Sequence, residues 1–250
     1  MFIDDSLDVD GGNLIAADIT SDKISLANGG VLSHANATTA SVYDLELSVL
    51  TSLVIDSTSK IDVTGKGYLG GYSGGNNSNT GRTFGNTTIG GSATYSGGSY
   101  GGPGGVYGNY PVSAVYGSIM SPNEPGSGGG ACCNGYPGGN GGGLVKIAAG
   151  SLTVDGGILA DGGNGSASGN ASGGGSGGGV FINVSALVGV GAISAKGGGS
   201  PLGVGAGGGG RIAIYYNLMT LPTANVIVNG GTSSNAAFNG GTGTFYNQVK

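Results

Sequence analysis

Two adjacent cysteines, Cys132 and Cys133, carry the most distinctive chemistry of this 250-residue chain. They lie in GSGGGACCNGYPGG and are its only cysteines, so an ordinary disulfide framework is excluded. Glycine neighbours tolerate the backbone distortion that a disulfide between adjacent cysteines requires. The pattern favours such a disulfide, and it leaves open bonds to a neighbouring subunit and two free thiols.

Metal and histidine chemistry have little support. His34 is the single histidine, so a histidine-based triad or a zinc site lacks its other members, and we expect a core residue. Asp8 and Asp10 precede Gly11 and Gly12, which is how calcium loops begin, but the later glutamate of such loops is missing. We predict no metal and no cofactor, with Asp8 and Asp10 as the weak calcium candidates.

Paired carboxylates for glycoside cleavage are also not expected. The outward positions of the strands predicted below are occupied by residues that offer no acid pair: Lys146, Thr153, Leu159, Ser194 and Ala213. We therefore predict that the protein is not an enzyme.

Tyrosine is the strongest surface signal. Eight of the twelve tyrosines lie between residues 65 and 143, and six of them are our candidates for an adhesive surface: Tyr68, Tyr72, Tyr95, Tyr100, Tyr107 and Tyr110. Tyrosine provides a rigid, amphipathic contact area at low entropic cost. The alternative is that these rings form a small core inside their own segment, which has few aliphatic residues.

Composition restricts the partners. Charged residues make up 8% of the chain and the net charge is −5, so nucleic-acid binding, which needs clustered Lys and Arg, is not expected. No run of about 18 apolar residues exists, so we expect no membrane span. The chain contains 61 glycines without a Gly-X-Y period, which excludes collagen.

A repeat with glycine at its boundaries determines the predicted fold. GGLVKIAAGSLTVDGGILADGG, GGVFINVSALVGVGAISAKGG and GGRIAIYYNLMTLPTANVIVNGG each carry three short apolar segments, and Ile158, Ile193 and Val226 occupy equivalent positions. Such repetition predicts a solenoid, and period-two alternation makes its units strands. We predict an all-β, parallel β-helix of about five three-stranded coils. The inward residues are Leu47, Ile55, Val63, Ile147, Val154, Ile158, Ile182, Leu187, Ile193 and Ile214.

The glycine tracts leave the coil at one corner. They occupy residues 65–143, 161–179, 196–210 and 229–243, each after the third strand of a coil. Coils stack at about 4.8 Å, so the tracts lie on one another, and glycine leaves room for backbones packed so closely. We predict a second layer of extended or threefold-helical strands within one domain of residues 1–250, with flexible linkers as the alternative.

The two chain ends suggest subunit contacts. Partial coils at the termini offer apolar residues that could complete each other across subunits: Phe2, Leu7, Val9, Phe245 and Val249. A strand edge templates further pairing, and a head-to-tail contact does not close, so it generates a filament.

The strings GGGLVKIAAGSLTVDGGILADGGNG and GGGGRIAIYY resemble glycine-rich β-helix segments of very large secreted bacterial surface proteins of the adhesin type. The glycine tracts also look like those of phage tail-fibre tip adhesins, whose threefold glycine helices pack in a sandwich. The resemblance spans residues 14–250 and implies an extracellular or cell-surface, right-handed β-helix without a catalytic site.

Two functions follow as expectations. The first is a structural subunit of an extracellular filament, with other copies of the chain as partners. The second is an adhesin or receptor-binding module for surface glycans or host-cell attachment, including a phage tail-fibre tip.

Overall fold

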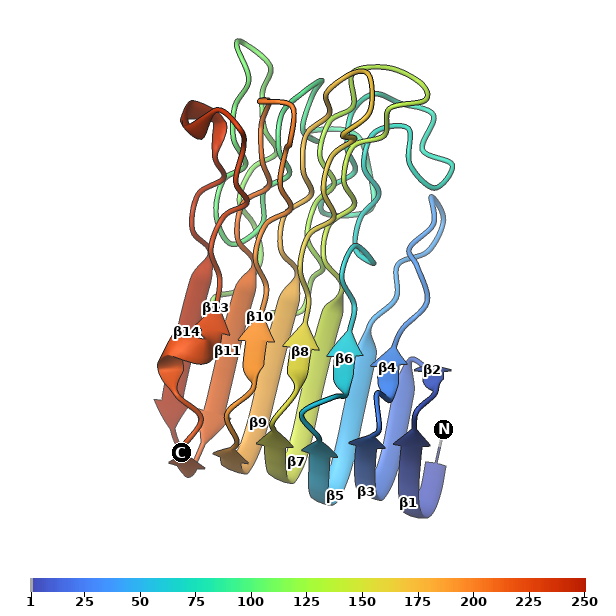
Figure 1. Ribbon diagram of the computed structural model, residues 1–250, viewed down its shortest axis with the longest axis vertical. Helices are drawn as coiled ribbons and strands as arrows, with labels where there is room; N and C mark the ends of the chain where they lie inside the picture. Colours follow the sequence, from blue (N-terminus) through green and yellow to red (C-terminus); the bar gives the residue numbers. More distant parts are fainter. Residues whose placement is uncertain (1) are drawn as a thin grey trace.

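Two parallel sheets form the framework of the molecule (Figure 1). The computed structural model describes residues 2–250, with side chains from Asp5 onward. The long-strand sheet has the order β1 (Phe2–Asp10), β3 (Asp18–Ala27), β5 (Leu45–Ile55), β7 (Leu144–Val154), β9 (Gly179–Val188), β11 (Arg211–Tyr216) and β14 (Thr244–Val249), and β12 (Leu218–Met219) also pairs with β9. The short-strand sheet has the order β13 (Val226–Ile227), β10 (Ala192–Ser194), β8 (Gly157–Leu159), β6 (Lys60–Asp62), β4 (Val31–Ser33) and β2 (Asn13–Ile15).

The chain alternates between the two sheets, so each strand lies beside the equivalent strand of the next repeat. All strand pairs within the two sheets are parallel. The helical elements described within residues 2–250 are two single-turn 3-10 helices, Thr223–Asn225 and Ala236–Phe238. The predicted all-β class is confirmed, and the long parallel sheets are compatible with a parallel β-helix.

The division into strands differs from the prediction. We expected separate strands around Val145–Ile147 and Leu152–Val154, but β7 runs through both segments. The pairing of β5 with β7 shifts register between Val49 and Ser52, as at a β-bulge. Within β7 the inward positions change from odd-numbered residues, Val145 and Ile147, to even-numbered ones, Leu152 and Val154, so both apolar segments reach the core without a break in the strand.

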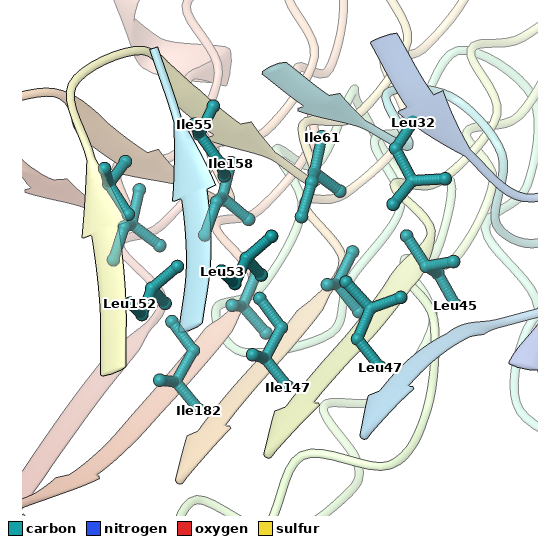
Figure 2. Packing of buried hydrophobic residues seen from close by; sticks show 14 of the residues in the cluster. Leu32, Leu45, Leu47, Leu53, Ile55, Ile61, Ile147, Leu152, Ile158 and Ile182 are labelled. Carbon is teal, nitrogen blue, oxygen red and sulfur yellow. The ribbon is translucent and has the colours of Figure 1, made fainter. Parts of the chain in front are cut away.

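Apolar side chains fill the space between the sheets in columns that run along the stack. Figure 2 shows residues of both sheets pointing toward one another, among them Leu47, Ile147 and Ile158. Ile158 pairs with Ile61 on one side and Ile193 on the other. All ten residues that the sequence placed inward are at most 1% exposed. This part of the prediction is confirmed.

The glycine tracts continue both sheets on one side of the molecule (Figure 1). Outgoing tracts (63–72, 160–165, 195–200 and 228–233) follow the short strands, and returning tracts (138–143, 172–178, 204–210 and 238–243) precede the long ones. Outgoing tracts hydrogen-bond to outgoing tracts, for example Gly162 N–H to Lys196 O at 2.9 Å. Returning tracts do the same, for example Gly177 N–H to Gly208 O at 2.9 Å.

The backbone partners of one tract change with a period of three residues. Along the returning tract 172–178, residues 173 and 176 donate to tract 127–130, residues 174 and 177 to tract 205–208, and residues 175 and 178 to tract 160–163. A backbone that turns by a third of a revolution per residue gives this pattern. The glycine tracts are thus an ordered, hydrogen-bonded layer, as predicted, and the linker alternative is wrong.

Glycine is required in this layer because neighbouring backbones occupy the place of a side chain. A Cβ atom added to Gly174 would fall on the carbonyl of Gly198, and one added to Gly207 would fall on the carbonyl of Gly175. In contrast, a Cβ at Gly157 in β8 meets nothing closer than the Leu159 side chain at 3.4 Å. The glycines of the layer therefore serve packing.

A charge in the core should unfold the coil, whereas a charge beside it should not. Ile158→Asp puts a carboxylate where the side chain is fully buried, and we expect a loss of roughly 3–5 kcal/mol in the free energy of unfolding. Leu159→Asp, on the half-buried outer face of the same strand, is the matched control. Chemical denaturation measures both, and equal stabilities would contradict the assigned register.

A methyl group in the glycine layer should also be costly. Gly174→Ala creates a clash between backbones, and we expect a loss of roughly 1–3 kcal/mol. Gly157→Ala, which has room for its methyl group, should leave stability unchanged or slightly raised. Amide exchange provides the second measurement: slow exchange in residues 172–178 is expected, and fast exchange throughout would show a flexible loop.

Candidate functional site

The two ends of the long-strand sheet are where backbone pairing is incomplete. Within the described residues β1 pairs only with β3, and β14 pairs only with β11. The two strands lie at opposite ends of the stack (Figure 1). An edge strand carries a row of N–H and C=O groups that can pair with another chain. The predicted contact residues thus lie on the two open edges of the sheet.

The free edge of β14 can be assigned residue by residue. Thr244 and Lys250, at either end of the strand, donate their N–H groups to carbonyls of the β11 segment at 3.0 and 2.8 Å. Backbone groups alternate between the two sides of a strand, so those of Phe245, Asn247 and Val249 point away from β11. Three pairs of N–H and C=O groups are therefore presented at this end.

Apolar side chains accompany this free edge. Phe245 is half-buried and continues the column of Ile212, whereas Val249 is 62% exposed and continues the column of Tyr216. The hydrophobic core is therefore open at the β14 end.

The β1 end is open in a similar way. Val9 is buried and Leu7 half-buried, and they pair with Leu26 and Ile24 of the next strand. The backbone of Phe2 pairs with Thr20, an exposed position, so its register differs from that of the core columns. The side chain of Phe2 lies outside the described part of the structure. Of the predicted contact residues at the β1 end, Leu7 and Val9 are thus the two whose side chains belong to the core.

Three further residues belong to the same two ends but were not among the predicted contact residues. Leu14 lies at the β1 end, and Met219 and Val226 lie at the β14 end, all partly buried against the core. Each is the last member of a column of equivalent repeat positions, for example Leu14–Leu32–Ile61. Extending each column to its end would have found them.

Two of the six candidate adhesive tyrosines are buried, so their assignment to the surface was wrong. Tyr68 is 3% exposed and Tyr100 is fully buried. Both rings contact Tyr116, with centroids 6.5 and 4.8 Å away, and Tyr68 Oη donates to Glu124 at 3.0 Å. Burial raises the pKa of Tyr100 and of Tyr116, so both stay protonated. Residues 65–143 form the long Gly/Tyr-rich insertion predicted at one corner of the coil. These rings form the small core of that insertion, which we gave as the alternative.

The remaining candidates lie nearer the surface. Tyr72, Tyr95 and Tyr107 are half-buried, and Tyr110 is 43% exposed. Tyr95 packs edge-on against Tyr107 and Tyr110, with centroids 5.3 and 5.9 Å away, and Tyr107 also contacts Phe238. This aromatic cluster ties the insertion to the last returning tract and leaves rings accessible.

The two cysteines form a disulfide with each other. The Cys132 N–H donates to Ser172 Oγ at 3.2 Å, and Asn170 Nδ2 approaches Cys133 Sγ at 3.7 Å. The pair lies in a turn closed by the Tyr136 N–H, which donates to the Cys133 carbonyl at 3.2 Å. The disulfide therefore joins no separate elements and stiffens a single turn.

The acidic candidates do not gather into a metal site. Asp8 and Asp10 are both exposed on β1, and the Asp10 carboxylate accepts a hydrogen bond from Asn28 Nδ2 at 2.7 Å. Within the part of the chain that is described, no group of three His, Cys, Asp or Glu side chains is arranged to hold a metal ion. Asp8 and Asp10 therefore belong to no such group.

The structure does assemble one charged cluster that the sequence reading missed. Lys146 Nζ lies 2.8 Å from an Asp44 carboxylate oxygen and 3.7 Å from a Glu46 oxygen. Partial burial opposes the charged lysine, but the hydrogen bond to Asp44 and both carboxylates raise its pKa. Glu46 and Lys146 are paired across β5 and β7, which is the signal that could have revealed the cluster. Because the lysine bridges both acids, the three side chains form an ion-pair network.

His34 is a core residue, as expected. It is fully buried, and its Nδ1 lies 2.7 Å from the Ala35 carbonyl. Its Nε2 has no hydrogen-bond partner and faces the backbone of Gly143. Desolvation by burial is the main cause that lowers the pKa of the ring, so the neutral form is favoured.

This burial predicts a pH dependence of stability. Above the ordinary histidine pKa of 6.5 both folded and unfolded chains hold neutral His34, so it has no effect there. As pH falls through 6.5 the unfolded chain takes up a proton that the folded chain resists, so stability falls. Melting temperatures between pH 7.5 and 5 should decline more steeply for the natural chain than for His34→Gln. Parallel curves would show that His34 does not titrate differently on folding.

No protein-family model matches the chain, and searches of curated proteins and of solved structures found no match either. No helix within residues 2–250 is long and apolar enough to cross a membrane. The two open sheet ends are therefore the candidate site on the geometry of this chain alone.

Proposed function

We propose that the protein is a non-enzymatic structural subunit of an extracellular filament, and that it polymerises head to tail through its open ends. The proposal rests on the two terminal strands of the long-strand sheet, β1 and β14. They lie at opposite ends of one stack, and each has one edge without a partner strand among the described residues. Both edges face outward along the axis of the stack, and both belong to strands that pair in parallel. A contact between them is heterologous and does not close, so it yields an open fibre.

The rest of the molecule suits a fibre. In the proposed form the coils wind as a right-handed parallel β-helix, and the glycine layer runs beside it along the whole filament. A chain with 8% charged residues and a net charge of −5 repels its neighbours only weakly. The disulfide between Cys132 and Cys133 supports an extracellular site, since disulfides persist in oxidising compartments.

An adhesin is the second candidate, and a separate observation favours it. The insertion has large apolar side chains that stay exposed among the described residues: Phe84, Ile89, Val106, Tyr110, Val115, Ile119 and Met120. Exposed apolar and aromatic groups gathered in one segment mark binding surfaces. With Tyr72, Tyr95 and Tyr107 they would form a contact surface for a glycan or a host-cell receptor.

Blocking the free edge of β14 should stop polymerisation and leave the coil folded. Asn247→Pro removes an N–H that points away from β11, whereas Asn247→Ala keeps it. Light scattering over a wide concentration range should show growth for the natural chain and for Asn247→Ala, and particles of one subunit for Asn247→Pro. Deletion of residues 1–9 should have the same effect from the other end.

Two results would decide against the filament. A natural chain that stays monomeric at all concentrations removes the proposal and leaves the adhesin as the better one. An Asn247→Pro chain that polymerises as well as the natural chain shows that growth does not use this edge.

A further inference from the structure

We infer that the two ends of neighbouring subunits share one coil, with β14 of one subunit and β1 of the next lying in the same layer. The inference rests on the proposed head-to-tail filament and specifies its joint. The partner of each open end is a second copy of this chain.

Each complete long strand has two halves, which in β5 meet at the register shift between Val49 and Ser52. In β5 the first half carries Leu45 and Leu47, and the second half carries Leu53 and Ile55. Through successive pairings with β11, β9 and β7, β14 aligns with the first half only. The Ser6–Asp10 segment of β1 aligns with the second half. The two terminal strands thus carry complementary halves of one coil.

The core columns support the same joint. One column runs Leu7–Ile24–Leu53–Leu152–Leu187–Met219, so Leu7 and Met219 are its two ends. Another runs Leu14–Leu32–Ile61–Ile158–Ile193–Val226. In a shared coil Leu7 of the next subunit lies on Met219, and Leu14 lies on Val226. Both columns then continue through the joint with apolar neighbours.

The two strands overlap at only two positions. Gln248 of β14 and Phe2 of β1 belong to the same row, which passes through Thr20. Val249 and Ile3 form the second overlap. The pairing of β1 with β3 is interrupted between Ile3 and Ser6, so Phe2 and Ile3 can give way without disturbing the rest of β1.

The directions of the backbone groups also fit. In the shared coil the Thr20 part of β3 of the next subunit lies beside β14. Glu46 N–H donates to Ala17 O at 2.7 Å, so the backbone groups of Thr20 face away from β5. In the shared coil they lie between those of Asn247 and Val249, which point away from β11. Donors and acceptors of the two edges then interleave as within the subunit.

The competing joint is simple stacking, in which β1 forms a new layer on top of β14. Leu7 and Leu14 would then lie two layers from Met219 and Val226, with no strand of the described residues between them. That arrangement leaves apolar column ends facing a gap, and it adds one more layer per subunit.

The axial repeat of the natural filament separates the two joints. The long-strand sheet has seven layers per subunit, from β1 to β14. A shared coil leaves six layers per subunit, or a repeat of about 29 Å at a strand spacing of about 4.8 Å. Simple stacking gives about 34 Å on the same spacing. Electron microscopy of the natural chain measures this repeat.

Cysteine cross-linking tests the joint at residue level. Chains with Thr20→Cys and chains with Gln248→Cys are mixed, assembled and oxidised. In a shared coil the two positions lie in adjacent strands, within reach of a disulfide, whereas simple stacking puts them about 10 Å apart. We expect about ten-fold more covalent dimer than from the control mixture of Ser48→Cys with Gln248→Cys, because Ser48 is paired with Thr20 and lies one layer further from Gln248. Ile15→Cys with Ile227→Cys reports on the short-strand sheet in the same way.

The expected result is an axial repeat of about 29 Å, together with Thr20–Gln248 dimers. Filaments with the longer repeat, or cysteine-bearing filaments that give no more Thr20–Gln248 dimer than the control mixture, would overturn the shared coil and leave the filament standing. If the natural chain forms no filaments, both inferences fail. If the cysteine variants do not assemble, the axial repeat of the natural filament decides alone.

Discussion

The distance between neighbouring parallel strands, about 4.8 Å, is the constraint on which the rest of this structure depends. Each repeat sends an excursion out of the coil at the same corner, so the excursions are brought to that spacing as well. Strands at this spacing carry side chains on their two faces, but a tract is surrounded by other tracts, whose carbonyls occupy the place of a Cβ atom. The chain meets the constraint with glycine in the tracts, and the tracts replace the missing side-chain contacts with hydrogen bonds to three neighbouring tracts, as along residues 172–178. The sheets and the glycine layer are thus two consequences of one spacing.

The stacked arrangement leaves the two end layers of the molecule incomplete. In a stack each layer is stabilised by the layers beside it, so the first and last layers lack one neighbour. Here the unsatisfied groups are of two kinds, the backbone groups of β1 and β14 and the apolar column ends such as Leu7 and Met219. Both kinds recur in the same register because they are produced by the same repeat. A copy of the chain is the partner that we propose for both, because its register matches them once Phe2 and Ile3 give way.

The period-two alternation of apolar residues and the Gly-Gly pairs at the repeat boundaries were enough to predict the core from the sequence. Residues such as Ile158 and Ile193 occupy the same position in successive repeats. The continuous β7 was not predictable, since its inward positions change from odd to even residue numbers between Ile147 and Leu152, and in the apolar pattern this change looks like a turn. Tyrosine burial was not predictable either. Tyr68 and Tyr100 became core residues because Tyr116 and Glu124 lie beside them, and those contacts join residues far apart in the insertion.

The glycine layer also separates the two surfaces that the proposals use. The assembly surfaces lie at the two ends of the stack, whereas the accessible rings of the Tyr95 cluster lie on the insertion, which leaves the side of the stack (Figure 1). Because the layer is hydrogen-bonded rather than flexible, it holds the insertion in a fixed place relative to the coils. A filament built from such subunits presents one copy of the insertion per subunit at regular intervals. Weak contacts at each copy then add through multivalency, so polymerisation and adhesion would reinforce each other in one fibre.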